Sequence, residues 1–119
     1  MKIVINACFG GFSVSLEAAR HMASRGCEIA KREVEEFDEK TADPTKQNDF
    51  EQRFGLRWYG YGDYGRDSEQ LVSAVEELGS LASGEMANLR VVEIPDGVEW
   101  EIEEYDGNEH VAESHRTWN

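Results

Sequence analysis

Residues 89–113, LRVVEIPDGVEWEIEEYDGNEHVAE, decide the fold of this chain. Apolar and β-branched side chains over 89–94 predict a strand, and the PDG tripeptide at 95–97 predicts a turn after it. Apolar and acidic residues then alternate over 98–103. That alternation predicts a half-buried strand with an acidic outer face.

A tight turn follows this second strand. Asp106-Gly107 is a preferred pair for a two-residue hairpin loop, so a return strand is expected over about residues 108–113. Strands joined by such a turn pair antiparallel. The last third of the chain therefore predicts a C-terminal β-hairpin.

The N-terminal segment adds a strand and a helix. KIVIN at 2–6 is β-branched and apolar, and predicts a buried strand. The loop ACFGGF follows at 7–12, after which Ser13 or Ser15 can cap a helix that runs to about Arg25.

A second helix is expected in the middle of the chain, where Asp67 or Ser68 can cap a segment that runs to about Leu81. Its apolar side chains recur with helical spacing. They are Leu71, Val72, Val75, Leu78 and Ala82.

Residues 27–66 give weaker signals. The charged segment 27–40 predicts either a short strand or a frayed helix, and the polar segment 41–52 predicts an exposed loop. Glycine alternates with aromatic residues over 54–66, which predicts a short strand or an irregular loop. These elements together predict an α+β fold: an antiparallel β-sheet with two helices packed against it and a C-terminal β-hairpin. With 119 residues, a single domain over 1–119 is expected.

The charge excludes several classes of protein. Twenty-five acidic and 12 basic side chains give a formal net charge of -13. A general nucleic-acid binder needs a basic face, and an anionic membrane repels an acidic protein, so neither partner is expected. Two cysteines are too few for a disulfide scaffold, which favours a cytoplasmic protein.

No enzyme is predicted. The sequence contains no HExxH, GxSxG, phosphate-loop or paired CxxC motif. His110, Glu113 and nearby acidic residues are either metal ligands or solvated hairpin residues, and we favour the second because a metal site needs three or four convergent ligands. No cofactor, catalytic residue or metal site is expected.

Two segments carry candidate ligand-binding residues. In the loop before the first helix, Gly10 and Gly11 allow a ligand close to backbone N–H groups, and Phe9 or Phe12 can stack on a base. The alternative is a tight turn with a phenylalanine in the core. Arg57 lies among aromatic residues, a composition typical of interfaces and base-stacking pockets, or of a packed irregular loop.

The last residues, His115-Arg116-Thr117-Trp118, suggest a docked chain end. Arg116 can grip a phosphate with its guanidinium group, with Thr117 beside it, or pair with the acidic hairpin. The acidic run over 99–106 is either a solvated strand face or a row of carboxylates that imitates DNA phosphates.

KIVIN at 2–6, CFGGFSVS at 8–15 and VVEIPDGVEWEIEEYDGNEHVAESHRTW at 91–118 resemble a widespread family of small phage and prophage proteins. With the second helix, these segments cover about half of the chain. Within that family the chain is most similar to the type-one anti-Thoeris sponges, which are anti-defence proteins. Residues 27–66 take no part in the resemblance.

The resemblance implies a non-catalytic protein that sequesters a cyclic ADP-ribose isomer, a signal made by a TIR-domain defence enzyme, in the cytoplasm of an infected bacterial cell. It also implies homodimers or larger homo-oligomers with pockets at the subunit boundary. Some such sponges also look able to hold cyclic oligonucleotides.

The resemblance supplies no strict binding motif. The chemistry of this chain therefore suggests that aromatic rings stack the adenine while Arg57, Arg116 and the Gly10–Gly11 amides hold the pyrophosphate. The alternative function is an acidic DNA mimic that inhibits a host defence nuclease, such as a CRISPR effector.

Overall fold

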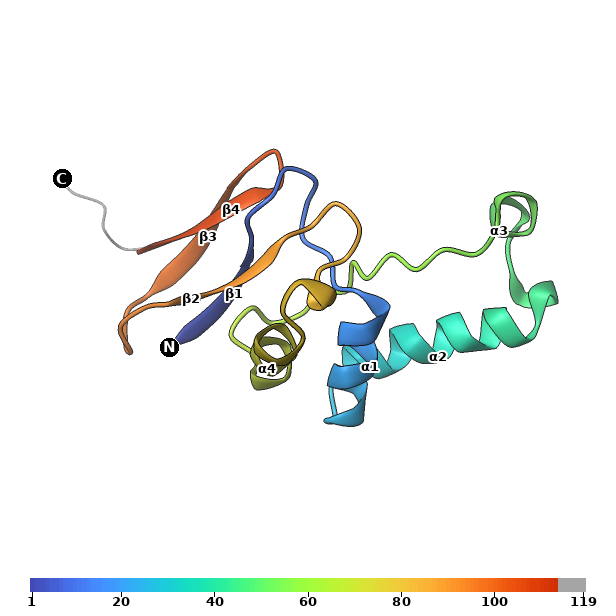
Figure 1. Cartoon of the computed structure of the whole chain (residues 1–119), viewed down its shortest axis with the longest axis horizontal. Coiled ribbons are helices and arrows are strands. Elements are labelled where there is room, and N and C mark those ends of the chain that lie inside the picture. The colour runs from blue at the N-terminus through green and yellow to red at the C-terminus, as the bar shows by residue number, and fades with distance from the viewer. Residues whose placement is uncertain (114–119) are drawn as a thin grey trace.

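A computed structural model describes residues 1–113 of the chain. Its elements are β1 (Lys2–Asn6), α1 (Leu16–Ser24), α2 (Glu28–Ala42), the 3-10 turn η1 (Pro44–Lys46), α3 (Asp49–Phe54), α4 (Glu69–Leu78), the 3-10 turn η2 (Gly79–Ala82), β2 (Leu89–Glu93), β3 (Trp100–Tyr105) and β4 (Asn108–Glu113). The predicted α+β fold is confirmed, with the strands arranged as two antiparallel ladders, β1–β2 and β3–β4 (Figure 1).

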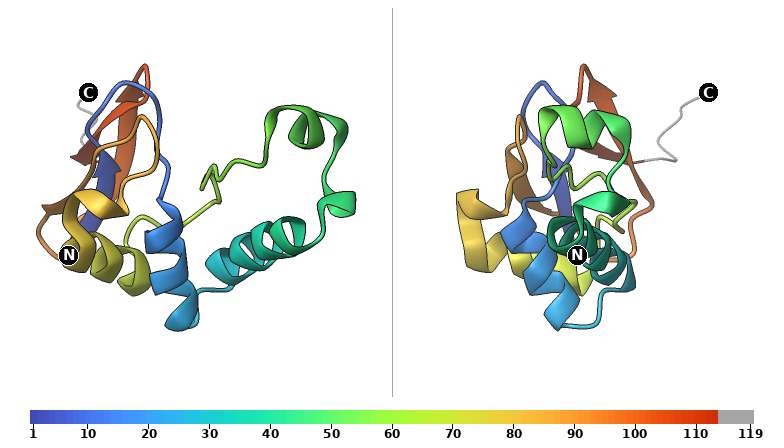
Figure 2. Two further views of the ribbon diagram at one scale, coloured as in Figure 1. Left: turned by 45° about the vertical axis from the view of Figure 1, so that its right-hand side comes forward. Right: turned by 90° about the vertical axis from the view of Figure 1, so that its right-hand side faces the viewer.

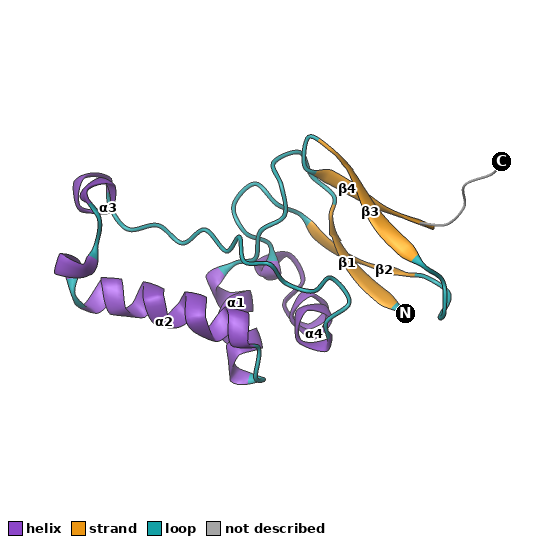
Figure 3. Cartoon of the chain, turned by 180° about the vertical axis from the view of Figure 1, so that it is seen from behind, coloured by secondary structure: helices purple, strands orange, loops and turns teal. Residues whose placement is uncertain are grey.

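Strand β1 is buried on both faces. It pairs with β2 so that Val4 lies opposite Val91, and both pack in one core with α1 and α4. Ile3 and Ile5 alternate with Val4 and point to the other face, where they are also buried. On that side β4 lies along β1 (Figure 3). Burial on both faces explains why β1 is an unbroken apolar run.

The C-terminal hairpin is confirmed with the expected turn. Trp100 of β3 pairs with Glu113 of β4, and Tyr105 pairs with Asn108. Asp106 and Gly107 both have positive φ, 52° and 86°, as a type I′ hairpin turn requires. The return strand has the predicted bounds.

Two capped helices supply most of the helical core. Ser15 caps α1 by accepting a hydrogen bond from Ala18 N at 3.0 Å, and Ser68 caps α4 by accepting from Leu71 N at 3.3 Å. Helix α4 ends at Leu78 rather than near residue 81, and η2 continues the chain. The buried side chains of these helices are Ala18, Ala19, Met22, Leu71, Val72, Ala74 and Val75.

The structure decides one expectation for the middle of the chain and corrects another. Of the two alternatives for the charged segment, the helix is observed, as the 15-residue α2. The prediction of an exposed loop over 41–52 is wrong, because that segment contains η1 and most of α3. Helix α3 begins with a capping box, in which Asn48 and Glu51 each bind the other's backbone N–H. The glycine–aromatic segment is irregular and contains no strand.

We call residues 35–59 the arm and the other described residues, 1–34 and 60–113, the body. No residue of the arm is buried. Figures 1 and 2 show α2 and α3 projecting away from the strands, with the chain returning as an extended segment. The molecule measures 57 × 29 × 23 Å, and its radius of gyration is 16.1 Å. A compact chain of this length has about 13–14 Å, so the arm accounts for the elongation.

Within residues 1–113, no helix is long and apolar enough to cross a membrane.

Candidate functional site

Three segments that are distant in sequence meet at one corner of the body. They are residues 8–12, 84–88 and 105–109, and we call them the loop–turn junction. Gly10 N donates to the carbonyl of Asp106 at 3.1 Å. A Cβ placed on Gly107 would lie 2.3 Å from Gly11 N, and one placed on Gly10 would lie 2.5 Å from the carbonyl oxygen of Met86. The three backbones therefore touch, and only glycine fits at Gly10 and Gly107.

Asn6, the fully buried last residue of β1, connects these segments. Its Nδ2 donates to the carbonyls of Cys8 and Gly107, each at 2.8 Å, and its Oδ1 accepts from Asn88 N at 2.8 Å. Both amide protons and the amide oxygen thus have partners. A satisfied buried amide fixes the relative position of all three backbones.

An ion pair lies beneath the junction. Arg66 donates to both carboxylate oxygens of Glu109, at 2.5 and 2.9 Å, and the Glu109 side chain is only 5% exposed. Glu109 also accepts from Asn6 N at 2.8 Å. The Arg66 guanidinium lies 3.8 Å from the ring centroid of Phe12. This arrangement neutralises the buried carboxylate and anchors β4 to the loop.

The same arginine covers an edge of β1. Val4 N donates to the carbonyl of Arg66 at 2.8 Å, and Arg66 Nη1 donates to the carbonyl of Val4 at 3.3 Å. These groups of Val4 point away from β2, where an unpaired strand edge would otherwise be exposed. Arg66 and Glu109 together therefore occupy the place of a neighbouring strand.

Two aromatic rings stand on this buried frame. Phe9 is 56% exposed and Tyr105 is 76% exposed, and their centroids lie 6.4 Å apart at an interplanar angle of 82°. Met86, with φ of 64°, is also exposed beside Gly10. Exposed rings held by a buried polar network form a preorganised surface for a flat, partly apolar ligand.

The predicted glycine pair has a definite role in this geometry. Gly10 N–H binds Asp106, and the hairpin turn packs over Gly11 N. Helix α1 begins only at Leu16, so its N-terminus is separated from the pair. Gly10 and Gly11 thus dock the turn that carries Tyr105. Phe12 is partly buried against the core, beneath Arg66.

The other predicted site residues lie apart from the rings. Arg57 is paired with Glu85 at 2.6 Å, and both side chains are more than half exposed. Glu85 belongs to the 84–88 segment of the loop–turn junction, so its ion pair links Arg57 to the junction. Arg116 and Thr117 lie outside the described residues, as do His115 and Trp118.

Most cations of the described residues are already paired. Eight lysine and arginine side chains contact carboxylates, whereas Arg32, Arg53 and Arg90 have no ion pair within residues 1–113. Within residues 1–113, an arginine or lysine that binds an anionic ligand is therefore either one of these three or one that first releases a carboxylate.

Within residues 1–113, no group of three or more histidine, cysteine, aspartate or glutamate side chains is placed to hold a metal ion. Cys8 and Cys27 are free thiols that are partly buried. Cys8 Sγ lies 3.5 Å from the carbonyl of Phe9.

Sequence reasoning did not single out Asn6, Arg66, Tyr105 or Glu109. The sequence carries a signal for two of these residues. Asn6 is a polar residue at the end of the buried run of β1, and Glu109 is a carboxylate at an inward position of β4. A buried carboxylate needs a cation, and an amide needs partners, but neither rule says which residues supply them.

No protein-family model, curated protein or solved structure matches this chain.

Proposed function

We propose that the protein is a non-catalytic phage anti-defence protein that sequesters a cyclic ADP-ribose isomer in the cytoplasm of the infected host cell. The observation that supports this most is the exposed Phe9–Tyr105 pair on the buried frame of Asn6, Arg66 and Glu109. The segments that carry the resemblance, residues 8–15 and 91–118, supply both rings.

Stacking provides the first part of the binding energy in this proposal. A base stacked on an aromatic side chain contributes about 1–3 kcal/mol. The frame beneath the rings lowers the entropic cost of binding, because the loop and the turn are fixed before the ligand arrives. Gly10 and Gly11 contribute by docking the turn.

Arginines provide the second part. Arg57 exchanges Glu85 for a ligand phosphate at little cost, since an exposed ion pair contributes only about 0–1 kcal/mol. Arg116 and Thr117 hold the other phosphate oxygens through charge-assisted hydrogen bonds.

Self-association completes the site in this proposal. Phe9 and Tyr105 leave one side of a ligand open to solvent. A second copy placed over the rings closes that side, so we propose a homodimer or a higher homo-oligomer. Light scattering at tens of micromolar checks this, and a monomer at that concentration contradicts it.

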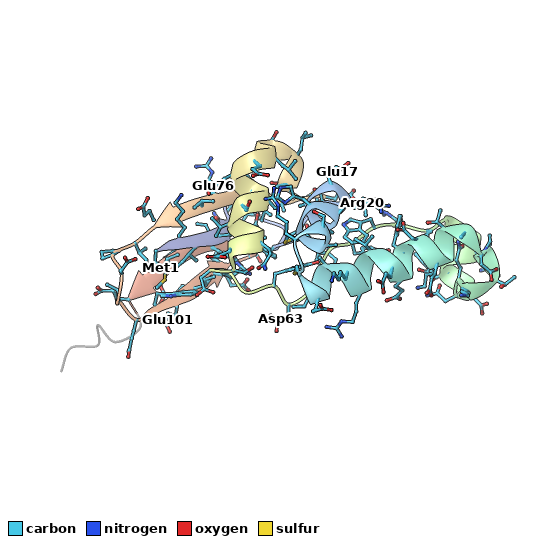
Figure 4. All side chains as sticks on the ribbon, turned by 90° about the horizontal axis from the view of Figure 1, so that it is seen from below. Met1, Glu17, Arg20, Asp63, Glu76 and Glu101 are labelled. Atoms are coloured by element: carbon cyan, nitrogen blue, oxygen red, sulfur yellow. The ribbon has the colours of Figure 1, made fainter. Side chains whose placement is uncertain are left out.

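An acidic DNA mimic remains the second candidate because of the hairpin's outer face. Glu101, Glu103 and Glu104 of β3 are exposed, and Figure 4 shows Glu101 at the opposite border of the molecule from Glu76 of α4. A row of carboxylates on a strand suits a surface that binds DNA phosphates.

Calorimetry with a panel of cyclic nucleotides and ADP-ribose isomers tests the first proposal. We expect Phe9→Leu and Tyr105→Leu each to weaken binding about fivefold or more, because each removes a stacking surface. Phe50→Leu, a 58% exposed phenylalanine of the arm, is the matched control and should leave affinity unchanged. Ligand released by heating should be intact, and cleavage products would instead show an enzyme.

A second pair of variants separates the two candidates. For a sponge, Arg116→Ala should weaken binding about 10- to 150-fold, whereas Glu99, Glu101 and Glu103 changed together to Gln should have little effect. For a DNA mimic the pattern reverses. Circular dichroism and melting curves establish first that both variants fold. Phage protection that survives Arg116→Ala but is lost with the glutamines contradicts the sponge.

A further inference from the structure

A separate cavity of about 140 Å³ lies where the arm leaves the body. Helix α2 provides one wall with Glu36, Phe37 and Lys40, and the returning segment provides the other with Arg57, Trp58 and Tyr59. Of the proposed ligand-binding residues that lie within 1–113, only Arg57 lines it.

Aromatic rings form much of the wall. Phe37 and Trp58 are perpendicular, at 87°, with centroids 5.6 Å apart. Trp58 is held in place, because its indole N–H donates to the carbonyl of Val14 at 3.0 Å. Val14 N in turn donates to the carbonyl of Gly60 at 3.0 Å, so the body fixes this wall on both sides of Tyr59.

Carboxylates outnumber cations around the cavity. Lys40 contacts both oxygens of Glu51 at 3.2 Å and Glu36 at 3.3 Å, and Arg57 is bound by Glu85. Glu33, a further lining residue, accepts a hydrogen bond from the hydroxyl of Tyr64. Both cations thus already have carboxylate partners, and three carboxylates, Glu33, Glu36 and Glu51, line the cavity against two cations.

The protonation states agree with this charge. A hydrogen bond from Asn48 N, followed by that from Lys40, lowers the pKa of Glu51. Burial, followed by the hydrogen bond to Glu33, raises the pKa of Tyr64, so its hydroxyl keeps the proton that it donates. At neutral pH Glu51 is therefore ionised and Tyr64 remains a hydrogen-bond donor to Glu33.

The size of the cavity limits its occupant. An apolar cavity of about 150 Å³ in a protein accommodates a molecule the size of benzene, and this cavity has a similar volume. Pockets for larger organic ligands have about 300–1,000 Å³, so this cavity suits a smaller group. A substituted ammonium group fits this volume. Aromatic rings near carboxylates are the surroundings that select such a cation.

We infer that the cavity between α2 and the segment around Trp58 binds an alkylammonium group, held against the Phe37, Trp58 and Tyr59 rings by the surrounding carboxylates. The site is distinct from the loop–turn junction and does not depend on the proposed function. The cation can be a free small amine or the side chain of a lysine on another protein.

Titration with choline, followed by NMR of the Trp58 indole N–H, tests the inference. The variant Trp58→Phe assigns that signal among the three tryptophans. We expect saturable shifts of the Trp58 indole and the Gly60 amide. The neutral isostere 3,3-dimethylbutan-1-ol should cause none, because it has the shape of choline without the charge.

Two further probes distinguish the sources of the cation. Spermidine represents a free amine, and a blocked trimethyllysine dipeptide represents a protein side chain. The probe that saturates at the lower concentration identifies the source, and either result supports the site.

Matched variants test the wall. Glu36→Gln should weaken choline binding about three- to tenfold, since it removes a nearby carboxylate. Glu39→Gln is the control on the same helix: Glu39 pairs with Lys46 at 3.8 Å and does not line the cavity, so its change should be less than about twofold. Phe37→Leu should weaken binding about two- to fivefold, and Phe50→Leu should not.

Three results would overturn the inference: no saturable shift with any of the three cations, equal shifts with the neutral isostere, or equal effects of Glu36→Gln and Glu39→Gln.

Discussion

The body and the arm differ in what holds them together. In the body, two central polar side chains are buried and paired: Asn6 is fully enclosed, and Glu109 lies in an ion pair with Arg66. In the arm, the contacts are exposed, such as the Phe50–Phe54 ring pair and the capping box of α3. Because buried polar contacts are costly to break and exposed ones are not, we expect the body to be rigid and the arm to be marginally stable.

Glu109→Ala should have the largest effect on the body. It leaves the Arg66 guanidinium partly buried without its counterion and removes the acceptor of Asn6 N–H. We expect the free energy of unfolding to fall by about 3–5 kcal/mol in urea titrations. Glu104→Gln is the control, since Glu104 is the exposed partner of Glu109 across the hairpin. A loss of less than about 1 kcal/mol for Glu109→Ala, which is typical of an exposed ion pair, would refute a buried anchor.

The pair of variants Gly107→Ala and Gly97→Ala separates the cost of a steric collision from the cost of backbone strain alone. Both Gly107 and Gly97 have positive φ, 86° and 81°, but a Cβ on Gly97 meets nothing within 4 Å. Gly97→Ala should therefore cost about 1–2 kcal/mol for strain. Gly107→Ala should cost at least about 1 kcal/mol more, because its Cβ collides with Gly11. Equal losses in thermal unfolding would show that the turn does not press against the loop.

Equivalent helix caps should act differently in the two regions. Ser15→Ala removes the cap of α1 and a hydrogen bond to the carbonyl of Leu81, and should reduce global stability by about 1–2 kcal/mol. Asn48→Ala removes the cap of α3 and should change global stability by less than about 0.5 kcal/mol while it unwinds α3. Urea titrations measure global stability, and amide exchange of Asp49–Phe54 measures the unwinding of α3. If Asn48→Ala lowers the global free energy of unfolding as much as Ser15→Ala does, the arm unfolds together with the body.

Acid should loosen the arm before the body. Since the folded arm holds the pKa of Glu51 below its ordinary value of 4.5, the contribution of Glu51 is complete above that pH and is lost as the pH falls through the folded-state pKa. NMR from about pH 6 to about pH 3 should show α3 amides losing protection before those of β1. In Glu51→Gln, the α3 amides should no longer lose protection at a higher pH than the β1 amides. If they still do, groups other than Glu51 cause the pH dependence of the arm.

The sequence was sufficient where a local pattern coincides with a buried contact. KIVIN at 2–6 and the hairpin around Asp106-Gly107 have strong local signals and form the predicted strands and turn. Helix α2 has weaker apolar patterning, because only Ala30 and Val34 of its 15 residues are buried. The Asn48–Glu51 spacing is a capping-box signal for α3 within a segment that otherwise reads as a loop.

The candidate site depended on contacts that local patterns do not specify. Phe9 was predicted as a ligand-binding residue from its loop, but Tyr105 lies 96 residues later along the chain. The two rings meet because the hairpin turn docks on the loop through Gly107, Gly11 and the Asn6 amide. Arg66 and Glu109 likewise become partners across 43 residues. Spacing along the chain carries no information on such pairs, whereas burial of one charge requires that a partner exist.

NMR mapping of a bound cyclic ADP-ribose isomer tests the central claim most directly, because it compares the junction with the arm in one measurement. We predict saturable shifts of the amides at residues 8–12 and 105–109, with the amides of α3 unchanged. Shifts confined to the arm, or no shifts at a ligand concentration in the millimolar range, would contradict the assignment of ligand binding to the Phe9–Tyr105 rings.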